Sequence, residues 1–328
     1  VEGVEVEHPR TLYIPRALRS LSALLYAISI FPRALRLRPR PDVILGSWAY
    51  PDACAAIAIA RAMGVPAVVK VHGSDLDVVA KMPGPRAIMR ALLPRAAAVI
   101  AVSRPLARDV AALGVPPDRI HTVDNGVDSQ RFFVRDRKAA RALLGLPIDG
   151  KLLVYIGHLK RSKGIRELCA AYAIARQGIP DLRLVMVGDG EERQSCDQFA
   201  ACHDGRVVVA GAWPHEHVPL WLAAADALVL PSWHEGTPNV VLEALACGRR
   251  VVATRVGGTP DLITSAKLGD LCEVKNPHGL ALAMIRAACT PYDPAQVAAM
   301  GSRGDWHRSA AALYRILAQV SVRRARAP

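Results

Sequence analysis

The chain has 328 residues with a formal net charge of +13, and 52% of them are hydrophobic but only 5% aromatic. A single hydrophobic core rarely extends beyond roughly 250 to 300 residues, so this length favours two domains. The seven cysteines are odd in number and include no C-x-x-C pair, which argues against a disulfide framework and a zinc site. The first residues are acids and alternating valines rather than the layout of a signal peptide, so we expect a cytoplasmic protein.

Arginines flank an apolar stretch near the N-terminus, residues 21–31, which Pro15 and Pro32 bound closely. This stretch is too short to span a bilayer of about 30 Å. Two interpretations stay open: a core helix with solvated arginines at its ends, or a helix on an anionic membrane surface, held through Arg16 to Arg40 at the inner face of the cytoplasmic membrane. Nucleic-acid binding is the weakest use of the charge, because the arginines are not interleaved with exposed aromatic residues.

The first half of the chain alternates short apolar runs with helical patterns. Strands are predicted at residues 42–45, 67–71 and 97–102, and helices at residues 53–63, 88–93 and 106–113. This rhythm is typical of a doubly wound parallel sheet. It predicts a Rossmann-like domain over residues 1–134 that is incomplete at its start, because the first convincing β-α-β unit begins only near Asp42.

Turn residues at 124–128 interrupt the rhythm, so we place a hinge at residues 123–135. A charged helix is predicted at residues 136–146. Further strands are predicted at residues 151–156, 182–187, 207–210, 227–230 and 250–254, each followed by a helical pattern. The sequence therefore predicts a second α/β domain over residues 135–308.

Residues 230–248 hold the most informative stretch of the chain. A buried strand is expected to end at Pro231, and a helix to follow with Thr237 as its N-cap, Pro238 at its first position and Gly248 at its end. A helix that begins at the carboxyl end of a parallel strand offers free backbone N–H groups. The stretch therefore predicts a phosphate-binding site.

Glu243 lies within this helix among apolar residues, where a carboxylate is costly unless it has a partner. It stands too far along the helix to act in a capping box, which leaves a local buried hydrogen bond or a ligand hydroxyl, and we favour the ligand. Glu235 precedes it by eight positions, in the loop. Two carboxylates on either side of a phosphate site suit a ribose hydroxyl and a sugar hydroxyl.

With these two glutamates, four more motifs occur in the order found in family 4 of the retaining glycosyltransferases, which the chain resembles from about Asp42 onward. They lie at residues 125–128 with Phe132, 157–164, 187–190 and 256–261. The resemblance implies a GT-B fold, in which two Rossmann-like, doubly wound parallel-sheet domains face each other across a cleft. It also implies that residues 309–328 comprise a C-terminal helix, which crosses back to the N-terminal domain, and a basic tail.

The same resemblance implies a nucleotide-diphosphate sugar, most readily a UDP-sugar, held by the second domain without a metal or other cofactor. Glu235 would contact the donor sugar, Glu243 the ribose, and Lys163 the charge that builds on the leaving phosphate. Where many members carry an arginine, this chain has His158. The full donor set is Gly157, His158, Lys163, Gly188, Glu235, Gly236, Thr237, Pro238, Asn239, Val240, Val241 and Glu243.

The first domain would hold the acceptor, a saccharide or lipid-linked saccharide, as in enzymes that build bacterial exopolysaccharide or teichuronic-type polymers. His72 ends a predicted strand, and the resemblance sets it against the donor sugar or transition state, which makes His72, Lys163 and Glu235 the catalytic set. The alternative for His72 is a hydrogen bond at a strand end. The expected acceptor-side residues are Gly73, Asp75 and Asn125.

Other candidates are weighed lower. His215 and His217 are expected at the surface, and Trp213, Trp221, Trp233 and Trp306 in packing. Besides the transferase, the sequence leaves open a nucleotide-sugar epimerase of the same fold and a truncated, non-catalytic nucleotide-sugar-binding protein. Family members usually begin with a strand and a glycine-rich loop that do not precede Val1 here, so we expect nucleotide binding with impaired transfer.

Overall fold

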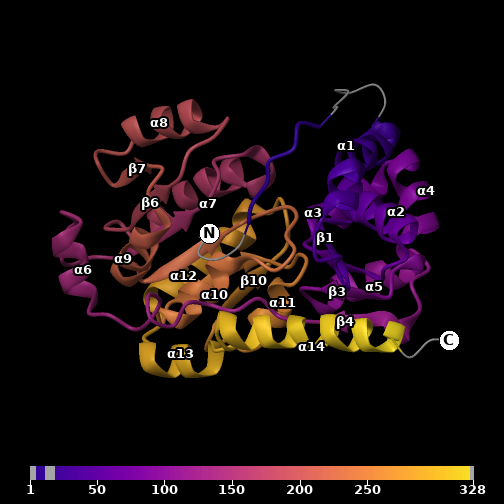
Figure 1. Ribbon diagram of the computed structural model, residues 1–328. Coiled ribbons are helices and arrows are strands. Elements are labelled where there is room, and N and C mark those ends of the chain that lie inside the picture. The colour runs from indigo at the N-terminus through magenta and orange to yellow at the C-terminus, as the bar shows by residue number, and fades with distance from the viewer. Residues whose placement is uncertain (1–4, 12–18, 326–328) are drawn as a thin grey trace. The chain divides into compact units, whose positions relative to one another are not determined.

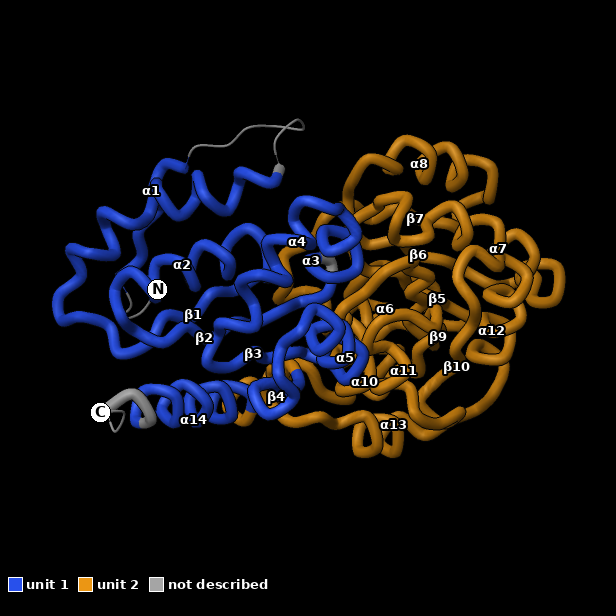
Figure 2. The backbone as a smooth tube through the Cα atoms, turned by 90° about the vertical axis from the view of Figure 1, so that its right-hand side faces the viewer, with its two compact units in different colours: residues 1–124, 309–328 blue, residues 125–308 orange. Residues whose placement is uncertain are grey.

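The computed structural model describes residues 5–11 and 19–325, and the chain divides into two compact units. Unit 1 comprises Val1–Asp124 and Ser309–Pro328, and unit 2 comprises Asn125–Arg308 (Figure 2). The division after Asp124 lies within the segment 123–135 in which the sequence analysis places a hinge. The C-terminal residues group with the first unit.

Unit 1 is built on a four-stranded parallel sheet with the strand order β1-β2-β3-β4. Its strands are β1 (Ile44–Ser47), β2 (Ala67–Val71), β3 (Ala98–Ala101) and β4 (Ile120–Thr122). Its helices are α1 (Ser22–Arg36), α2 (Cys54–Met63), α3 (Ser74–Asp77), α4 (Pro83–Leu92), α5 (Arg104–Ala112) and the part of α14 (Trp306–Ala325) that begins at Ser309.

Successive residues of the unit 1 strands point to opposite faces of the sheet, and each face has its own core. Val69 packs in a cluster with residues of α2, α4 and α5. Its neighbour Val68 packs instead with Ile316 and Val320 of α14. The C-terminal helix therefore covers the sheet face that α2 leaves open (Figure 2).

Unit 2 has a six-stranded parallel sheet with the order β10-β9-β8-β5-β6-β7. Figure 1 labels β6, β7 and β10 of this sheet. Its strands are β5 (Leu152–Ile156), β6 (Arg183–Val187), β7 (Val207–Gly211), β8 (Ala227–Leu230), β9 (Arg250–Thr254) and β10 (Gly269–Cys272). Its helices are α6 (Arg137–Leu143), α7 (Ile165–Gly178), α8 (Arg193–Ala201), α9 (Val218–Ala224), α10 (Asn239–Ala246), α11 (Thr259–Leu262), α12 (Pro277–Cys289) and α13 (Pro294–Gly301).

Two parallel-sheet α/β domains were predicted, and the structure confirms them. The sequence analysis missed two strands, β4 and β10. Both are edge strands in which polar residues stand beside apolar ones, as in the sequence Gly-Asp-Leu-Cys of β10. Such short mixed segments lack the β-branched run by which a buried strand is recognised.

The arginine-flanked stretch near the N-terminus forms α1, which does not stop at Pro32 but continues to Arg36. A proline inside a helix removes one backbone donor, and here the packing of Ala23 and Ala34 against the unit 1 core offsets that loss. Leu24 and Ile28 are exposed on the other side. Arg16 of the predicted basic patch lies outside the described residues. Within the described ranges, no helix is both long and apolar enough to cross a membrane.

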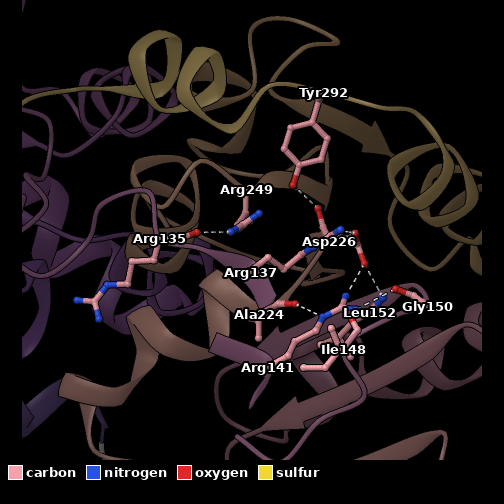
Figure 3. A network of polar contacts seen from close by, with 10 residues as sticks. All are labelled: Arg135, Arg137, Arg141, Ile148, Gly150, Leu152, Ala224, Asp226, Arg249 and Tyr292. Atoms are coloured by element: carbon pink, nitrogen blue, oxygen red, sulfur yellow. Dashed lines mark hydrogen bonds and ion pairs between the residues drawn. The ribbon is translucent and has the colours of Figure 1, made fainter. Parts of the chain in front are cut away.

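A buried ion pair ties α6 to the amino ends of β5 and β8 in unit 2 (Figure 3). The Arg141 side chain is 1% exposed, and its Nη2 donates to Asp226 Oδ2 over 2.9 Å. Its other donors reach the carbonyls of Ala224, Ile148 and Gly150, while Asp226 also accepts from the Leu152 amide. Because nearly every donor of the guanidinium has a partner, this buried charge is compensated.

Candidate functional site

The predicted donor residues of unit 2 lie in the loops that follow β5, β6 and β8 and in helix α10 after the last of these loops. The carboxyl ends of parallel strands share one edge of a sheet. Gly188 adopts a φ of +149° directly against Gly157, so that a Cβ there would collide with the Gly157 carbonyl. Gly257, after β9, lies as closely against the backbone of Glu235, and the Gly258 amide donates to the Gly236 carbonyl over 2.6 Å. Close glycine contacts therefore bring these loops together.

Lys163 and Glu235 form an ion pair at this edge. Lys163 ends the 3-10 turn Arg161–Lys163 after β5, and its Nζ lies 2.7 Å from Glu235 Oε1. The same two loops are joined by the backbone, since the Trp233 amide donates to the Ser162 carbonyl. The Glu235 side chain is 10% exposed and that of Lys163 30%, so the ammonium stays accessible to a ligand while its position is fixed.

Helix α10 begins at Asn239 with Pro238 as its N-cap, not at Pro238 with Thr237 as its N-cap. Pro238 has an extended ψ of 111°, so helical geometry starts one residue later than the sequence analysis predicted. The prediction that the helix ends at Gly248 is confirmed, since Gly248 has a φ of +70° just after the C-cap Cys247. The amide of Asn239 and that of the next residue stand at the open end of the helix, where an anion binds favourably.

Asn125, assigned from the resemblance to the acceptor side, belongs to unit 2 and contacts this helix start. Its Nδ2 donates to Asn239 Oδ1 over 2.9 Å, and the residue is buried. The hydrogen bond fixes the first residue of α10. We therefore interpret Asn125 as a residue that orients the N-terminal end of α10.

Glu243 has a protein partner, His215, whose Nε2 lies 2.8 Å from Glu243 Oε1. The glutamate side chain is 12% exposed and that of the histidine 62%. Burial raises the pKa of the Glu243 carboxyl above its ordinary value, and the hydrogen bond with His215 opposes part of that rise. His215 is exposed, as the sequence analysis predicted, and in addition it contacts one oxygen of Glu243, a contact that was not predicted.

Trp233 also does more than pack. Its Nε1 donates to Glu167 Oε1 over 3.2 Å, and Lys275 Nζ lies 4.4 Å from the centre of its ring. Arg161 lies on the same ring at 5.9 Å. The indole ring therefore makes cation–π contacts with two side chains, in the loop that also carries Glu235. Its place two residues before Glu235, in the segment after β8, was the signal in the sequence that could have pointed to these contacts.

The remaining donor candidates lie on the same loops and at the start of α10. His158 is exposed after β5, and its carbonyl accepts a hydrogen bond from the Tyr155 hydroxyl over 2.7 Å. The predicted residues at this edge of unit 2 are Gly157, His158, Lys163, Gly188, Glu235, Gly236, Thr237, Pro238, Asn239, Val240, Val241 and Glu243. The structure therefore brings the sequence-predicted donor set to one edge of one sheet.

In unit 1, His72 follows β2 at the carboxyl edge of the sheet. Its Nε2 lies 2.8 Å from Ser47 Oγ, at the end of the neighbouring strand β1. Burial is the main reason why the pKa of His72 is lowered from its ordinary value; Lys70 lowers it further and Asp75 opposes the shift. The imidazole is therefore neutral near pH 7.

Asp75 is fully buried, and its oxygens accept hydrogen bonds from the backbone amides of Ala49, His72 and Gly73. These contacts link the loops that follow β1 and β2. An aspartate that accepts several backbone N–H groups holds a loop in one conformation. Asp75 and Gly73 therefore determine where the His72 ring stands.

Trp48 is a second feature of this edge that the sequence analysis did not single out. It has a φ of 78°, an uncommon conformation for a bulky residue, and its ring stacks on His72 with a centroid separation of 5.8 Å. Hydrogen bonds from its amide to Lys70 and from Ala53 to its carbonyl keep it there. Its position directly after β1, level with His72 after β2, is the signal that points to it.

Comparison with known proteins decides the family. Residues 1–131 match the model of Glycosyltransferase Family 4, and residues 150–289 match the model of Glycosyl transferases group 1. The chain belongs to these family 4, group 1 glycosyltransferases. The predicted family resemblance is thus confirmed.

Two curated relatives illustrate the likeness. A glycosyltransferase assigned to teichuronic acid biosynthesis in Bacillus subtilis (strain 168) is 32% identical over 80% of this chain and 65% of the relative. The N-acetyl-alpha-D-glucosaminyl L-malate synthase of Bacillus anthracis is 31% identical over 74% of this chain and 64% of the relative. The chain thus spans slightly less than two thirds of the length of either protein.

Solved structures show that the fold is of the GT-B type. The Anabaena protein HepE in complex with UDP has a TM-score of 0.76 at 21% identity, covering 92% of this chain and 84% of HepE. The lipopolysaccharide outer core galactosyltransferase WaaB has a TM-score of 0.70 at 18% identity, covering 90% and 81%. At these identities the comparison shows the fold alone, and the candidate site is described from the geometry of this chain.

Proposed function

We propose that this glycosyltransferase-family chain transfers a sugar, with retention of anomeric configuration, from a UDP-sugar to a saccharide or lipid-linked saccharide acceptor. The observation that carries the proposal is the joint placement of Lys163, Glu235, Glu243 and the start of α10 at one edge of the unit 2 sheet. UDP is the nucleotide proposed because the similar HepE structure was solved with it.

Three groups of unit 2 bind different parts of the donor. Glu243, buried beside the open end of α10, accepts hydrogen bonds from the ribose hydroxyls with its carboxylate. The backbone amides at the start of α10 bind the diphosphate, and the Asn125 hydrogen bond keeps that end in place. Glu235 accepts hydrogen bonds from the donor sugar.

Lys163 stabilises the leaving group. When the bond between the sugar and the diphosphate breaks, about one extra negative charge builds on the phosphate oxygens, and a fixed ammonium lowers the energy of that state. The ion pair with Glu235 supports this role, because it holds Nζ beside the site without burying it. Lys163 thereby supplies, without a metal ion, the positive charge that the reaction needs.

Unit 1 supplies His72 and Trp48. A neutral imidazole, kept so by the lowered pKa, donates or accepts a hydrogen bond at a sugar hydroxyl without carrying its own charge. The exposed Trp48 ring offers an apolar face of the kind that packs on a sugar ring. We assign these two side chains to the reacting sugars and Asp75 to their positioning.

We also propose that the protein binds its acceptor at a membrane surface. Helix α1 exposes Leu24, Ile28 and Leu35, and Arg33 and Arg36 lie in its last turn. Apolar and basic side chains on one surface helix suit an anionic membrane at the cytoplasmic face. Co-sedimentation with anionic vesicles at low and high salt tests this, and absence of binding at low ionic strength would remove it.

The activity itself is tested by UDP release. The chain is incubated with UDP-glucose, UDP-galactose and UDP-N-acetylglucosamine, each with and without polyprenyl-linked saccharides, and UDP is measured by a coupled assay. We expect release from one of these donors, and the product anomer, read by NMR, to match the donor. Release from none of them, by a folded chain that binds UDP, would contradict the transfer proposal while leaving the binding site in place.

A further inference from the structure

A groove lies in unit 2 at the edge of the sheet opposite to the proposed donor site. It has a volume of about 670 Å³ and is lined by Lys151, Asp226 and Arg249, which directly precede β5, β8 and β9. Because these strands are parallel, residues that precede them lie at the amino edge, whereas the donor loops follow the same strands at the carboxyl edge. The groove is therefore separate from the proposed donor site.

The wall of this groove carries more cations than carboxylates. Its basic residues are Arg135, Arg137, Lys138, Lys151 and Arg249, and its acids are Asp136 and Asp226. Asp226 is already bound by Arg137 and Arg141, and Asp136 accepts the Ala139 amide as the N-cap of α6. In the described part of the chain, no carboxylate lies within ion-pair distance of Lys138, Lys151 or Arg249. The side chains that line the groove therefore carry a net positive charge.

Arg249 is the most informative of these cations. It is only 3% exposed, and its Nη2 donates to the Arg135 carbonyl over 3.2 Å, but its Nε is buried with no hydrogen-bond partner among the described residues. Figure 3 shows the Arg249 side chain with its hydrogen bond to the Arg135 carbonyl. A buried guanidinium without a carboxylate is costly, and an anion in the groove that Arg249 lines would lower that cost.

We propose that this groove is an anion site that binds a phosphate group, with Arg249 at its base and Lys138 and Lys151 at its rim. A guanidinium suits a phosphate because its planar N–H groups match the phosphate oxygens, and two lysines add charge without fixed geometry. The hydroxyl of Tyr292, bound to the Asp226 carbonyl over 2.7 Å, closes one side. The site does not depend on the proposed function.

One competing explanation comes from the same wall. Helix α12 ends here at Cys289, and the carbonyl end of a helix attracts cations, so the basic residues could serve the helix rather than a ligand. In that case an added phosphate would find no site. The two explanations differ in whether an anion binds at all and in which side chains its binding depends on.

Calorimetry at constant ionic strength tests the proposal, with the whole chain titrated by inorganic phosphate and, separately, by glucose 6-phosphate. We expect a phosphate to bind in this groove, with affinity lowered at least 10-fold in Arg249→Gln and in the double variant Lys138→Ala/Lys151→Ala. If glucose 6-phosphate binds more tightly than inorganic phosphate, the ligand of the groove is a phosphomonoester. If the two bind equally, the ligand is the phosphate ion itself.

The donor-side variant Lys163→Ala is the matched control, and its phosphate affinity should stay within about 2-fold of the parent chain. If Arg249→Gln does not fold, the double lysine variant decides, since both lysines lie at the rim. Binding that is lost in Lys163→Ala but kept in the groove variants would overturn the proposal, as would the absence of binding by the parent chain at millimolar phosphate.

Discussion

His215 Nε2 lies 2.8 Å from Glu243 Oε1, although 28 positions separate the two residues in the chain. The contact gives the buried glutamate of α10 a partner that reaches it from the loop after β7. Burial raises the pKa of Glu243 and His215 lowers part of that rise, so the charge on this carboxylate depends on both pH and its neighbour.

UDP affinity should therefore fall on acidification at a higher pH than an ordinary glutamate would give. The ribose hydroxyls need the ionised carboxylate as acceptor. Because the pKa of Glu243 is raised, its carboxylate is protonated at a higher pH than that of an ordinary glutamate, whose pKa is about 4.3. The measurement is the UDP dissociation constant from pH 4.5 to 8. In Glu243→Gln this part of the pH dependence should vanish, and its persistence would assign it to another group.

Replacing His215 should move that pH dependence upward. The hydrogen bond with His215 lowers the pKa of Glu243, so His215→Ala raises it and UDP binding weakens at a higher pH than in the parent chain. The same titration series measures the shift. His217→Ala, in the same 3-10 turn, is the control and should leave the profile in place. An unchanged or lowered midpoint in His215→Ala would refute the coupling.

Removing the Lys163 ammonium should slow the chemical step more than it weakens donor binding. A fixed charge that acts on the departing diphosphate typically contributes about 10²- to 10³-fold in kcat. Lys163→Ala should lose that factor in UDP release from the active UDP-sugar, and Lys163→Arg should restore part of it. Lys267→Ala, an exposed lysine after β9, should keep the parent rate. Equal rates in Lys163→Ala and the parent chain would exclude the role.

Asp226→Ala should destabilise unit 2 severely. It leaves the Arg141 guanidinium buried without its carboxylate and removes the acceptor of the Leu152 amide, a kind of loss that costs about 3–5 kcal/mol. The exposed pair of Asp197 with Arg193 is the comparison, and Asp197→Ala should cost less than about 1 kcal/mol. Urea unfolding followed by tryptophan fluorescence measures both, and similar losses in the two variants would contradict the account.

Much of the fold could be predicted from the sequence, because buried parallel strands are short β-branched runs between helical patterns. The runs at Ala67–Val71 and Arg250–Thr254 were predicted with their observed bounds. The edge strands β4 and β10 were not predicted, since their stability comes from pairing with a neighbouring strand rather than from their own composition. The start of α10 was predicted one residue early, a usual error at helix ends.

The residues predicted for the donor site come from motifs that are local in sequence, each in the segment after one strand. Side-chain contacts between distant segments were not predicted. His215 meets Glu243, and Arg141 meets Asp226 across 85 positions, through the arrangement of loops and helices around the sheet. No periodicity or spacing in the sequence marks a contact of that kind, which depends on the folded sheet.

Calorimetric titration of the chain with UDP tests the central claim most directly, with Glu243→Gln and the exposed Glu216→Gln beside it. We predict micromolar affinity, about −8 kcal/mol, for the parent chain and for Glu216→Gln. Glu243→Gln should bind about 10- to 100-fold more weakly, the usual effect of losing a hydrogen bond to a charged group. Absence of UDP binding by the folded chain, or equal binding by Glu243→Gln, would contradict a nucleotide-sugar site at this edge of unit 2.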